Sequence, residues 1–240
     1  MSSALAPLLE LRDVDPALAS ARSAVDAALR HRALRRSGGP LAAEIGLRSA
    51  VASAALESHA HDLDEVRGGT VTDPVVQGAL RVSAALDALA PRWTASPRQV
   101  LAKLHLLAAR GSVAENALGR PTSGAGRVDL LCAVIAEPAG MPALLRAAIV
   151  HGELLALRPF AGPSGVVARA AARLTLIADG LDPRGLIAPE IGHVAREPEY
   201  VGAANAFASG TADGIRSWIK HVCLSVEVAA SELSMLADGA

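Results

Sequence analysis

The sequence predicts a protein built mainly of α-helices, and two observations carry this prediction. Hydrophobic residues make up 51% of the chain and aromatic residues only 2%, so alanine, leucine, valine and isoleucine must fill the core. Such side chains favour close packing of one helix on another. Apolar residues also recur at helical spacing, for example at Val100, Leu104 and Leu107. A chain of 240 residues can bury a substantial core, and we expect one compact unit.

Start and stop signals place the first four helices. Three of them open with a capping residue followed by proline at the first helical position, at Asp15-Pro16, Asp73-Pro74 and Ser96-Pro97. The first helix ends before the pair Gly38-Gly39, and the second follows Pro40. The later two signals predict helices over about 75–89 and 98–109.

The middle of the chain breaks this pattern. Several glycines and a proline between Gly111 and Gly126 indicate a loop, and the run over 127–136 has enough β-branched residues to include a short strand. Helical signals then resume. Thr211 is a good N-cap for a long last helix, whose apolar residues fall on one face and form either core or a dimer surface.

Composition excludes several classes of function. A net charge of −1 gives no general attraction to nucleic acid or anionic lipid, and the basic cluster over 30–36 fits a solvated helix end. No apolar run is long enough to span a bilayer, and residues 1–7 lack the pattern of a secretion signal. Cys132 and Cys223 lie in apolar runs, which is typical of buried thiols. We therefore expect a soluble cytoplasmic protein that does not bind membranes, and any binding of nucleic acid would need a local patch.

The most informative segment is residues 158–169, which reads as a loop entering a helix. Its sequence is Arg-Pro-Phe-Ala-Gly-Pro-Ser-Gly-Val-Val-Ala-Arg. It resembles the central motif of the Fic (Fido) family, His-Pro-Phe-x-acidic-Gly-Asn-Gly-Arg-x-x-Arg, whose active members transfer AMP from ATP to protein hydroxyls. Pro159, Phe160, Gly165 and Arg169 match this motif. The resemblance implies a mainly helical Fic-like domain with a short β-hairpin flap, in which residues 158–169 connect two central helices.

Five positions of this motif depart from the family pattern, and each loss removes a chemical function. Arg158 stands where the family has its catalytic histidine, and a guanidinium cannot accept a proton. Gly162 replaces the acidic magnesium ligand, and Pro163 offers no N–H to an anion. Ser164 replaces asparagine, and Val166 replaces an arginine that would stabilise transferred phosphate. We expect no catalytic residue and no metal ligand here.

Histidines elsewhere in the chain are not expected to replace the lost base or the lost metal ligand. His151 lies seven residues before Arg158, which on a continuous helix separates the two backbones by about 10.5 Å. It is therefore expected to be a packed histidine and not a replacement base. His59 and His61 would point to different faces of a helix, so they do not predict a metal site.

A second motif lies about a hundred residues upstream. Residues 53–58, Ser-Ala-Ala-Leu-Glu-Ser, resemble the family's inhibitory helix motif, Ser/Thr-x-x-x-Glu-Gly/Asn. In inhibited members the glutamate pairs with the last arginine of the central motif and blocks productive ATP binding. The resemblance thus assigns inhibitory roles to Ser53 and Glu57 and predicts a buried or half-buried ion pair between Glu57 and Arg169.

The resemblance implies a degenerate member of the family, with an N-terminal helical extension over 1–39 and the Fic-like domain over 40–240. We expect an inactive protein that acts as a protein-interaction or nucleotide-sensing module. Ser164, Gly165 and Arg169 would contact a nucleotide such as ATP, without magnesium held by the motif. A protein partner would dock through the flap region, residues 121–137, unless this region is a plain surface loop with one buried edge. The alternatives are a nucleotidyltransferase that modifies protein hydroxyls through a non-standard site, and a DNA-associated helical regulator that uses the basic cluster.

Overall fold

The computed structural model describes residues 5–36, 38–138 and 140–239. Within these ranges the chain forms eleven α-helices and four short 3-10 helices. The α-helices are α1 (Val14–Leu29), α2 (Gly38–Ala55), α3 (Leu63–Arg67), α4 (Pro74–Leu89), α5 (Pro97–Ala109), α6 (Ala125–Ala136), α7 (Ala143–Leu157), α8 (Ser164–Ala178), α9 (Pro189–Ala195), α10 (Glu197–Ala208) and α11 (Ala212–Asp238). The 3-10 helices are Ala6–Glu10, Arg32–Arg35, Ala90–Arg92 and Glu115–Ala117.

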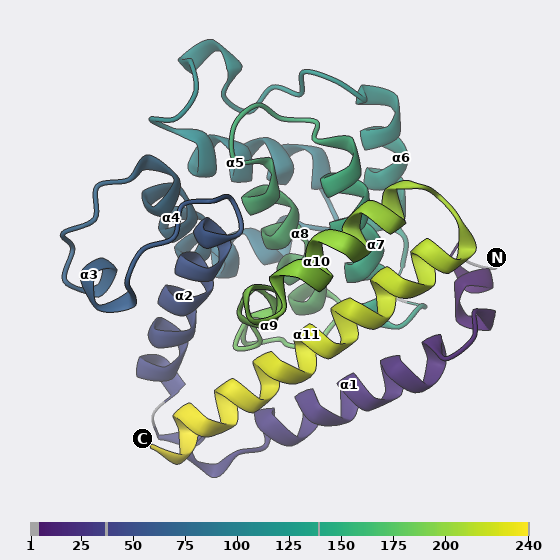
Figure 1. Cartoon of the computed structure of the whole chain (residues 1–240), viewed down its shortest axis with the longest axis horizontal. Helices are drawn as coiled ribbons and strands as arrows, with labels where there is room; N and C mark the ends of the chain where they lie inside the picture. Colours follow the sequence, from purple (N-terminus) through teal and green to yellow (C-terminus); the bar gives the residue numbers. More distant parts are fainter. Residues whose placement is uncertain (1–4, 37, 139, 240) are drawn as a thin grey trace.

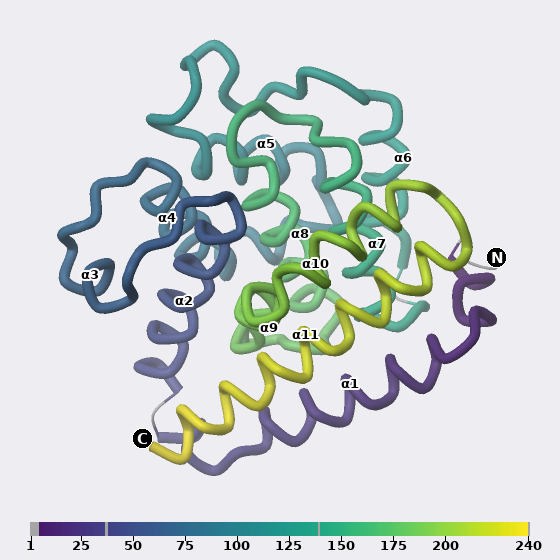
Figure 2. Tube along the Cα trace, in the orientation of Figure 1, coloured from purple at the N-terminus to yellow at the C-terminus, as the bar shows by residue number. Residues whose placement is uncertain are grey.

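The central helices are α7 and α8, which are buried along most of their length. They separate two apolar clusters. One cluster joins α1, the start of α2, α7 and α11, and the other joins the end of α2 with α4, α5, α6 and α8. Figure 1 shows the long helices α1 and α11 side by side along one face of the molecule. The tube in Figure 2 shows that both run in the same direction, so that the described chain ends lie at opposite ends of this pair.

Polar contacts at both ends fix the parallel arrangement of α1 and α11. At their N-terminal ends, Lys220 lies 3.5 Å from the carboxylate of Asp13. At their C-terminal ends, His31 Nε2 lies 3.1 Å from Asp238 Oδ1. The basic cluster over 30–36 therefore lies where α1 ends, as the sequence predicts, and one of its members already has an acidic neighbour.

Most of the predicted helices are confirmed. α4 and α5 begin at the prolines that the sequence indicates, and Asp73 Oδ1 accepts a hydrogen bond from Val75 N at 2.8 Å as an N-cap. Thr211 caps α11 through Gly214 N at 3.2 Å. The first helix starts slightly earlier than predicted, at Val14, after Asp13 in a left-handed conformation. It ends at Leu29 and not after Arg36, and Gly38 and Gly39 belong to α2 instead of separating the two helices. None of the helices in the described ranges has the length and apolar character needed to cross a membrane.

The predicted strand and β-hairpin flap are wrong. Across the described residues the structure has no β-strand, and residues 127–136 belong to α6. Val128, Leu131 and Ile135 are buried on one face of this helix, at the spacing of successive helical turns. Packing of this face outweighed the β preference of the valine and isoleucine side chains.

Candidate functional site

Residues 158–163 form the turn between α7 and α8, as the motif predicts. Arg158 ends α7 in a left-handed conformation with φ 41°, and Gly162 has φ 71°. Phe160 is buried and stacks on the ring of His105, with ring centroids 4.6 Å apart. The loop is therefore held by packing on its inner side, while Arg158 lies exposed at its outer side.

The predicted ion pair between Glu57 and Arg169 is present. Arg169 Nη2 donates to Glu57 Oε1 at 2.8 Å, and the side chain of Arg169 is only 2% exposed, whereas that of Glu57 is 22% exposed. Ser53 contributes two acceptors to the same guanidinium, its hydroxyl at 2.9 Å and its carbonyl at 2.8 Å. The last turn of α2 thereby binds the first turns of α8.

Gly165 makes room for this pair. A Cβ atom at position 165 would overlap Glu57 Oε1 and would lie 2.9 Å from Arg169 Nη1. The carboxylate of Glu57 therefore lies directly over the first turn of α8, whose backbone N–H groups have no acceptors within the helix. A negative charge is favourable at this end of a helix. Pro163 precedes the helix, and no side chain caps it.

An open cleft of about 710 Å³ lies beside the pair. Its floor includes Glu57, Arg169 and the start of α8, and α10 forms one wall. Ser164 lines the cleft and is 7% exposed. Its hydroxyl is buried and has no hydrogen-bond partner among the described residues. Arg158 adds a cation at the rim. The remaining lining is largely apolar, from Leu56, Leu155, Ala156, Phe160, Val201, Ala204 and Ala208.

Among the described residues that line the cleft there is no histidine, and the one carboxylate, Glu57, is paired with Arg169. His151 is 1% exposed, and its Nε2 lies 3.1 Å from the hydroxyl of Tyr200. Burial, the nearby Arg169 cation and His221 lower the pKa of His151 well below its usual value. Val166 is buried in the core, so its position offers no contact to a phosphate. His151 is thus a packed histidine, as expected.

No cluster of three or more metal-binding side chains suited to hold a metal ion occurs in the described part of the chain. His59 Nδ1 and His61 Nε2 both contact Asp73 Oδ2, at 2.7 Å and 3.3 Å. Burial acts to raise the pKa of Asp73, but hydrogen bonds from both histidines and from backbone N–H groups lower it to about 2. These residues fix the start of α4.

Two residues that sequence reasoning missed organise the site. Tyr200 accepts a hydrogen bond from Arg169 Nη1 at 3.2 Å, and it is the only tyrosine of the chain. His105 connects two loops, because its Nε2 donates to Ala161 O at 2.9 Å and its Nδ1 accepts from Gly119 N at 2.9 Å. The single occurrence of tyrosine was a weak signal for Tyr200, and nothing in the sequence marked His105.

The region expected to be a flap lies against the motif loop. Thr122 N donates to Pro159 O at 2.7 Å, which ties the segment before α6 to the start of the motif. From there α6 leads away with Leu130 70% exposed. Residues 121–137, for which a docking role is expected, therefore form a loop and a helix and not a hairpin.

Comparison with known proteins supports the fold. No family model and no curated protein matches the sequence. Among solved structures, the chain is similar to a Fic family protein from Desulfovibrio desulfuricans G20, with a TM-score of 0.75, 22% identity and coverage of 94% of this chain and 76% of that one. It is also similar to Fic-1 from C. elegans, with a TM-score of 0.69, 16% identity and coverage of 98% and 75%. This chain has the fold of the Fic proteins.

Proposed function

We propose that this Fic-fold protein is a catalytically inactive member of its fold group, which senses a nucleotide through the cleft that Glu57 partly covers. One observation carries the proposal. The inhibitory-type contact between Glu57 and Arg169 is intact at 2.8 Å, while the motif positions that would perform AMP transfer hold arginine, glycine and valine. The residues that would restrict access to the cleft are retained, whereas the residues that would carry out AMP transfer are replaced.

The chemistry of the replacements supports inactivity. Removal of a proton from an attacking hydroxyl requires an acceptor, and Arg158 has none. Magnesium prefers oxygen ligands in near-octahedral geometry, and Gly162 brings no side-chain oxygen. The residues present therefore do not fit a magnesium ion held by the motif. Loss of one charge-stabilising group commonly costs a factor of about 10² to 10³ in rate, and several are missing here.

The cleft retains features that suit a phosphate without metal. The first turn of α8 offers backbone N–H groups, Ser164 offers a hydroxyl, and Arg158 and Arg169 offer positive charge. The apolar lining suits a planar base. The Glu57 carboxylate lies over the same turn, so a phosphate must displace it. We expect weak binding by the wild-type protein and tighter binding once Glu57 is removed.

Calorimetric titration with ATP and ADP, with and without magnesium, tests this proposal on the wild-type protein and on Glu57→Gly. We expect Glu57→Gly to bind ADP at least tenfold more tightly than wild type, with little dependence on magnesium. Absence of binding to both proteins would reject nucleotide sensing. Incubation with labelled ATP and magnesium should leave both proteins unmodified, and label transfer by Glu57→Gly would contradict inactivity.

A protein-interaction role has support from a separate observation. Leu130 on α6 is 70% exposed, next to the loop that is tied to the motif. Exposed leucines of this kind occur at protein contacts as well as singly on ordinary surfaces. Leu130→Asp should leave ADP binding unchanged and should reduce capture of a partner if this region is the docking surface.

A further inference from the structure

Five aromatic rings are packed together beneath α10, behind the cleft. The ring of Tyr200 contacts three imidazoles, each from a different helix: His151 of α7, His193 of α9 and His221 of α11, at centroid separations of 5.8, 4.6 and 5.7 Å. Trp218 packs edge-on against His151 at 4.9 Å. All five residues are buried. Tyr200, from α10, thus covers three titratable rings that other helices contribute.

Hydrogen bonds fix the protonation of one of these imidazoles. Arg169 can only donate, so its bond to the Tyr200 hydroxyl leaves the tyrosine proton free for another acceptor. That acceptor is His151 Nε2, at 3.1 Å. A proton on His151 Nε2 would remove this acceptor and add a second cation beside Arg169. The packed arrangement therefore requires a neutral His151.

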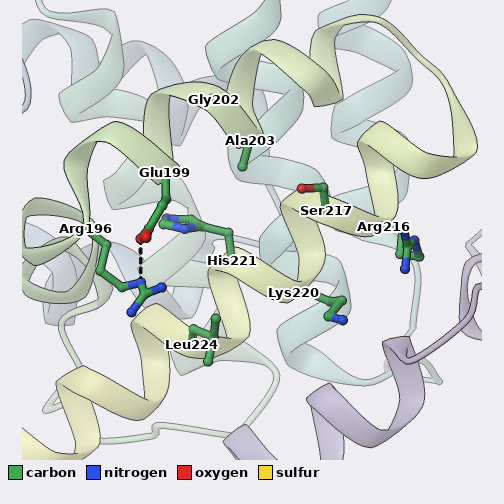
Figure 3. A pocket seen from close by; sticks show the side chains of 9 residues that line it. All are labelled: Arg196, Glu199, Gly202, Ala203, Arg216, Ser217, Lys220, His221 and Leu224. Carbon is green, nitrogen blue, oxygen red and sulfur yellow. Dashed lines mark ion pairs between the residues drawn. The ribbon is translucent and has the colours of Figure 1, made fainter.

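The other two histidines share a single position for a proton. His193 Nδ1 and His221 Nε2 lie 3.1 Å apart, so one of them must accept where the other donates. His221 also lines a surface groove of about 470 Å³ between α10 and α11. Figure 3 shows it beside Arg196 and Glu199. It is the most exposed histidine of the cluster, at 5%, against 1% for each of the other two.

Burial is the main factor that opposes protonation of the cluster. The Arg169 cation from α8 acts in the same direction on His151 and His193. Burial lowers the pKa of His193 well below its usual value and that of His221 to about 4. The other charged groups around the cluster are Glu57 beyond Arg169, Glu190 of α9, and four residues of the groove beside His221: Arg196, Glu199, Arg216 and Lys220. Glu199 favours a proton on His221, and Arg196 opposes it.

The helix that covers the rings is also a wall of the cleft. α10 buries only Tyr200, Ala203 and Phe207, and it lies between a break at Arg196 and Gly210, which has φ 71°. Its Val201, Ala204, Asn205 and Ala208 line the cleft. Displacement of α10 would therefore expose the three histidines and open the cleft in one movement.

We propose that α10 is an acid-sensitive gate: mild acidification favours a state in which α10 is displaced, its three covered histidines are protonated, and Tyr200 no longer contacts Arg169. A ligand held between α10 and α8 would be released by the same movement, since ligand binds the closed state and protons bind the open one. This last consequence rests on the proposed function, whereas the movement itself does not.

The size of the effect follows from proton linkage. An exposed histidine titrates near pH 6.5, and a covered one in this cluster remains neutral well below that value. Each histidine exposed by the movement therefore multiplies the open fraction by roughly eight between pH 7.0 and 5.5. Three histidines together give a factor of roughly 500, and two give roughly 70.

Hydrogen–deuterium exchange at pH 7.0 and 5.5, corrected for intrinsic exchange rates, tests the gate on the ligand-free protein. We expect the protection of residues 197–208 to fall by roughly 500-fold on acidification, with a much smaller change in α4. His193→Gln should reduce this fall by about eightfold, and His221→Gln should do the same if His193→Gln does not fold. His31→Gln, at the far end of α1, is the matched control and should behave as wild type.

Two results would overturn the gate. One is that the protection of α10 changes between the two pH values only as much as that of α4. The other is that His193→Gln and His221→Gln both lose as much α10 protection on acidification as the wild type does. An ADP titration at pH 7.0 with wild type and Glu57→Gly separates this inference from the proposed function. Lack of ADP binding by both proteins rejects nucleotide sensing only, because the exchange experiment uses no ligand.

Discussion

Gly165 lies directly beneath the carboxylate of Glu57, so closely that a single added methyl group would overlap the carboxylate oxygen. Gly165 has an ordinary helical backbone conformation, because its φ is not among the positive values of the chain. The glycine is therefore required by the space that the pair occupies and not by the backbone. The motif position and the upstream glutamate are matched parts of one contact.

Gly165→Ala should therefore displace Glu57 from Arg169. We expect a loss of about 1–3 kcal/mol in the free energy of unfolding, because the overlap forces the carboxylate away from a buried cation. In a Glu57→Ala background the same substitution should be nearly neutral, and a double-mutant cycle from urea unfolding measures the difference. Gly202→Ala is the control, since nothing lies within 4 Å of a Cβ there, and it should stabilise α10 by up to about 1 kcal/mol.

Truncation of the pair itself should be costly. Glu57→Ala leaves the Arg169 guanidinium buried with only neutral partners, and we expect a loss of about 3–5 kcal/mol in the free energy of unfolding. Glu44→Ala is a matched comparison, because Glu44 also pairs with two arginines, but Arg48 is only half-buried and Arg67 is exposed. Its loss should stay below about 1 kcal/mol. Equal losses in the two variants would show that the burial of Arg169 does not make the pair important.

The sequence allowed prediction of the pair but not of its surroundings. Glu57 and Arg169 belong to two motifs that keep their order and spacing, so a match in each was enough to place them together. Tyr200 and His105 meet their partners through tertiary contacts that span 14 to 56 residues, and no local pattern marks them. The prediction of a strand in the α6 segment was wrong for a different reason. Its valine and isoleucine residues favour a strand, while the spacing of its buried residues is that of a helix.

His105 should make a contribution to stability that depends on pH. Burial lowers its pKa, although its hydrogen bond to Ala161 O acts in the opposite direction. A histidine whose folded pKa is depressed stabilises the fold above the unfolded value of about 6.5 and loses that contribution as the pH falls. His105→Gln should cost about 1–3 kcal/mol at pH 7.5, since the Gly119 N–H and the Ala161 carbonyl lose their shared partner.

At pH 5.5 the difference in free energy of unfolding between wild type and His105→Gln should be smaller by up to about 1 kcal/mol. The reason is that only the wild type has a buried neutral imidazole that takes up a proton when the protein unfolds in acid. Urea unfolding of both proteins at the two pH values measures this change. The other buried histidines are common to both proteins, so their effects cancel in the comparison. A gap that widens in acid would contradict the neutral, doubly bonded state of His105.

The two cysteines should differ in reactivity. Burial raises the pKa of Cys223 to about 12, and burial also raises that of Cys132, which is only partly covered on α6. Because the thiolate is the reactive form, iodoacetamide should modify Cys132 slowly and Cys223 only after unfolding. Mass spectrometry of the native protein over time distinguishes the two sites, and Cys132→Ser provides the control for the remaining thiol.

Restoration of the missing motif residues should fail for a structural reason. Gly162 has φ 71°, and a Cβ atom there would lie 2.7 Å from Val113 Cγ1, so Gly162→Asp combines backbone strain with a steric overlap. Val166 is 2% exposed in the core, where an arginine would bring an unpaired charge. The set Arg158→His, Gly162→Asp, Pro163→Gly, Ser164→Asn and Val166→Arg should therefore lower the melting temperature and yield no AMP transfer.

Relief of the overlap tests whether packing is the obstacle. In the Gly162→Asp variant, the further substitution Val113→Ala should raise the free energy of unfolding by about 1 kcal/mol. In the wild-type protein, Val113→Ala should lower it, because methyl groups that pack against neighbours are removed. Thermal unfolding of the single and double variants gives this coupling. If the two effects are simply additive, the loop tolerates a side chain at position 162. The losses in the motif would then be chemical alone, and the restored protein should be assayed again with Glu57→Gly to remove the covering carboxylate.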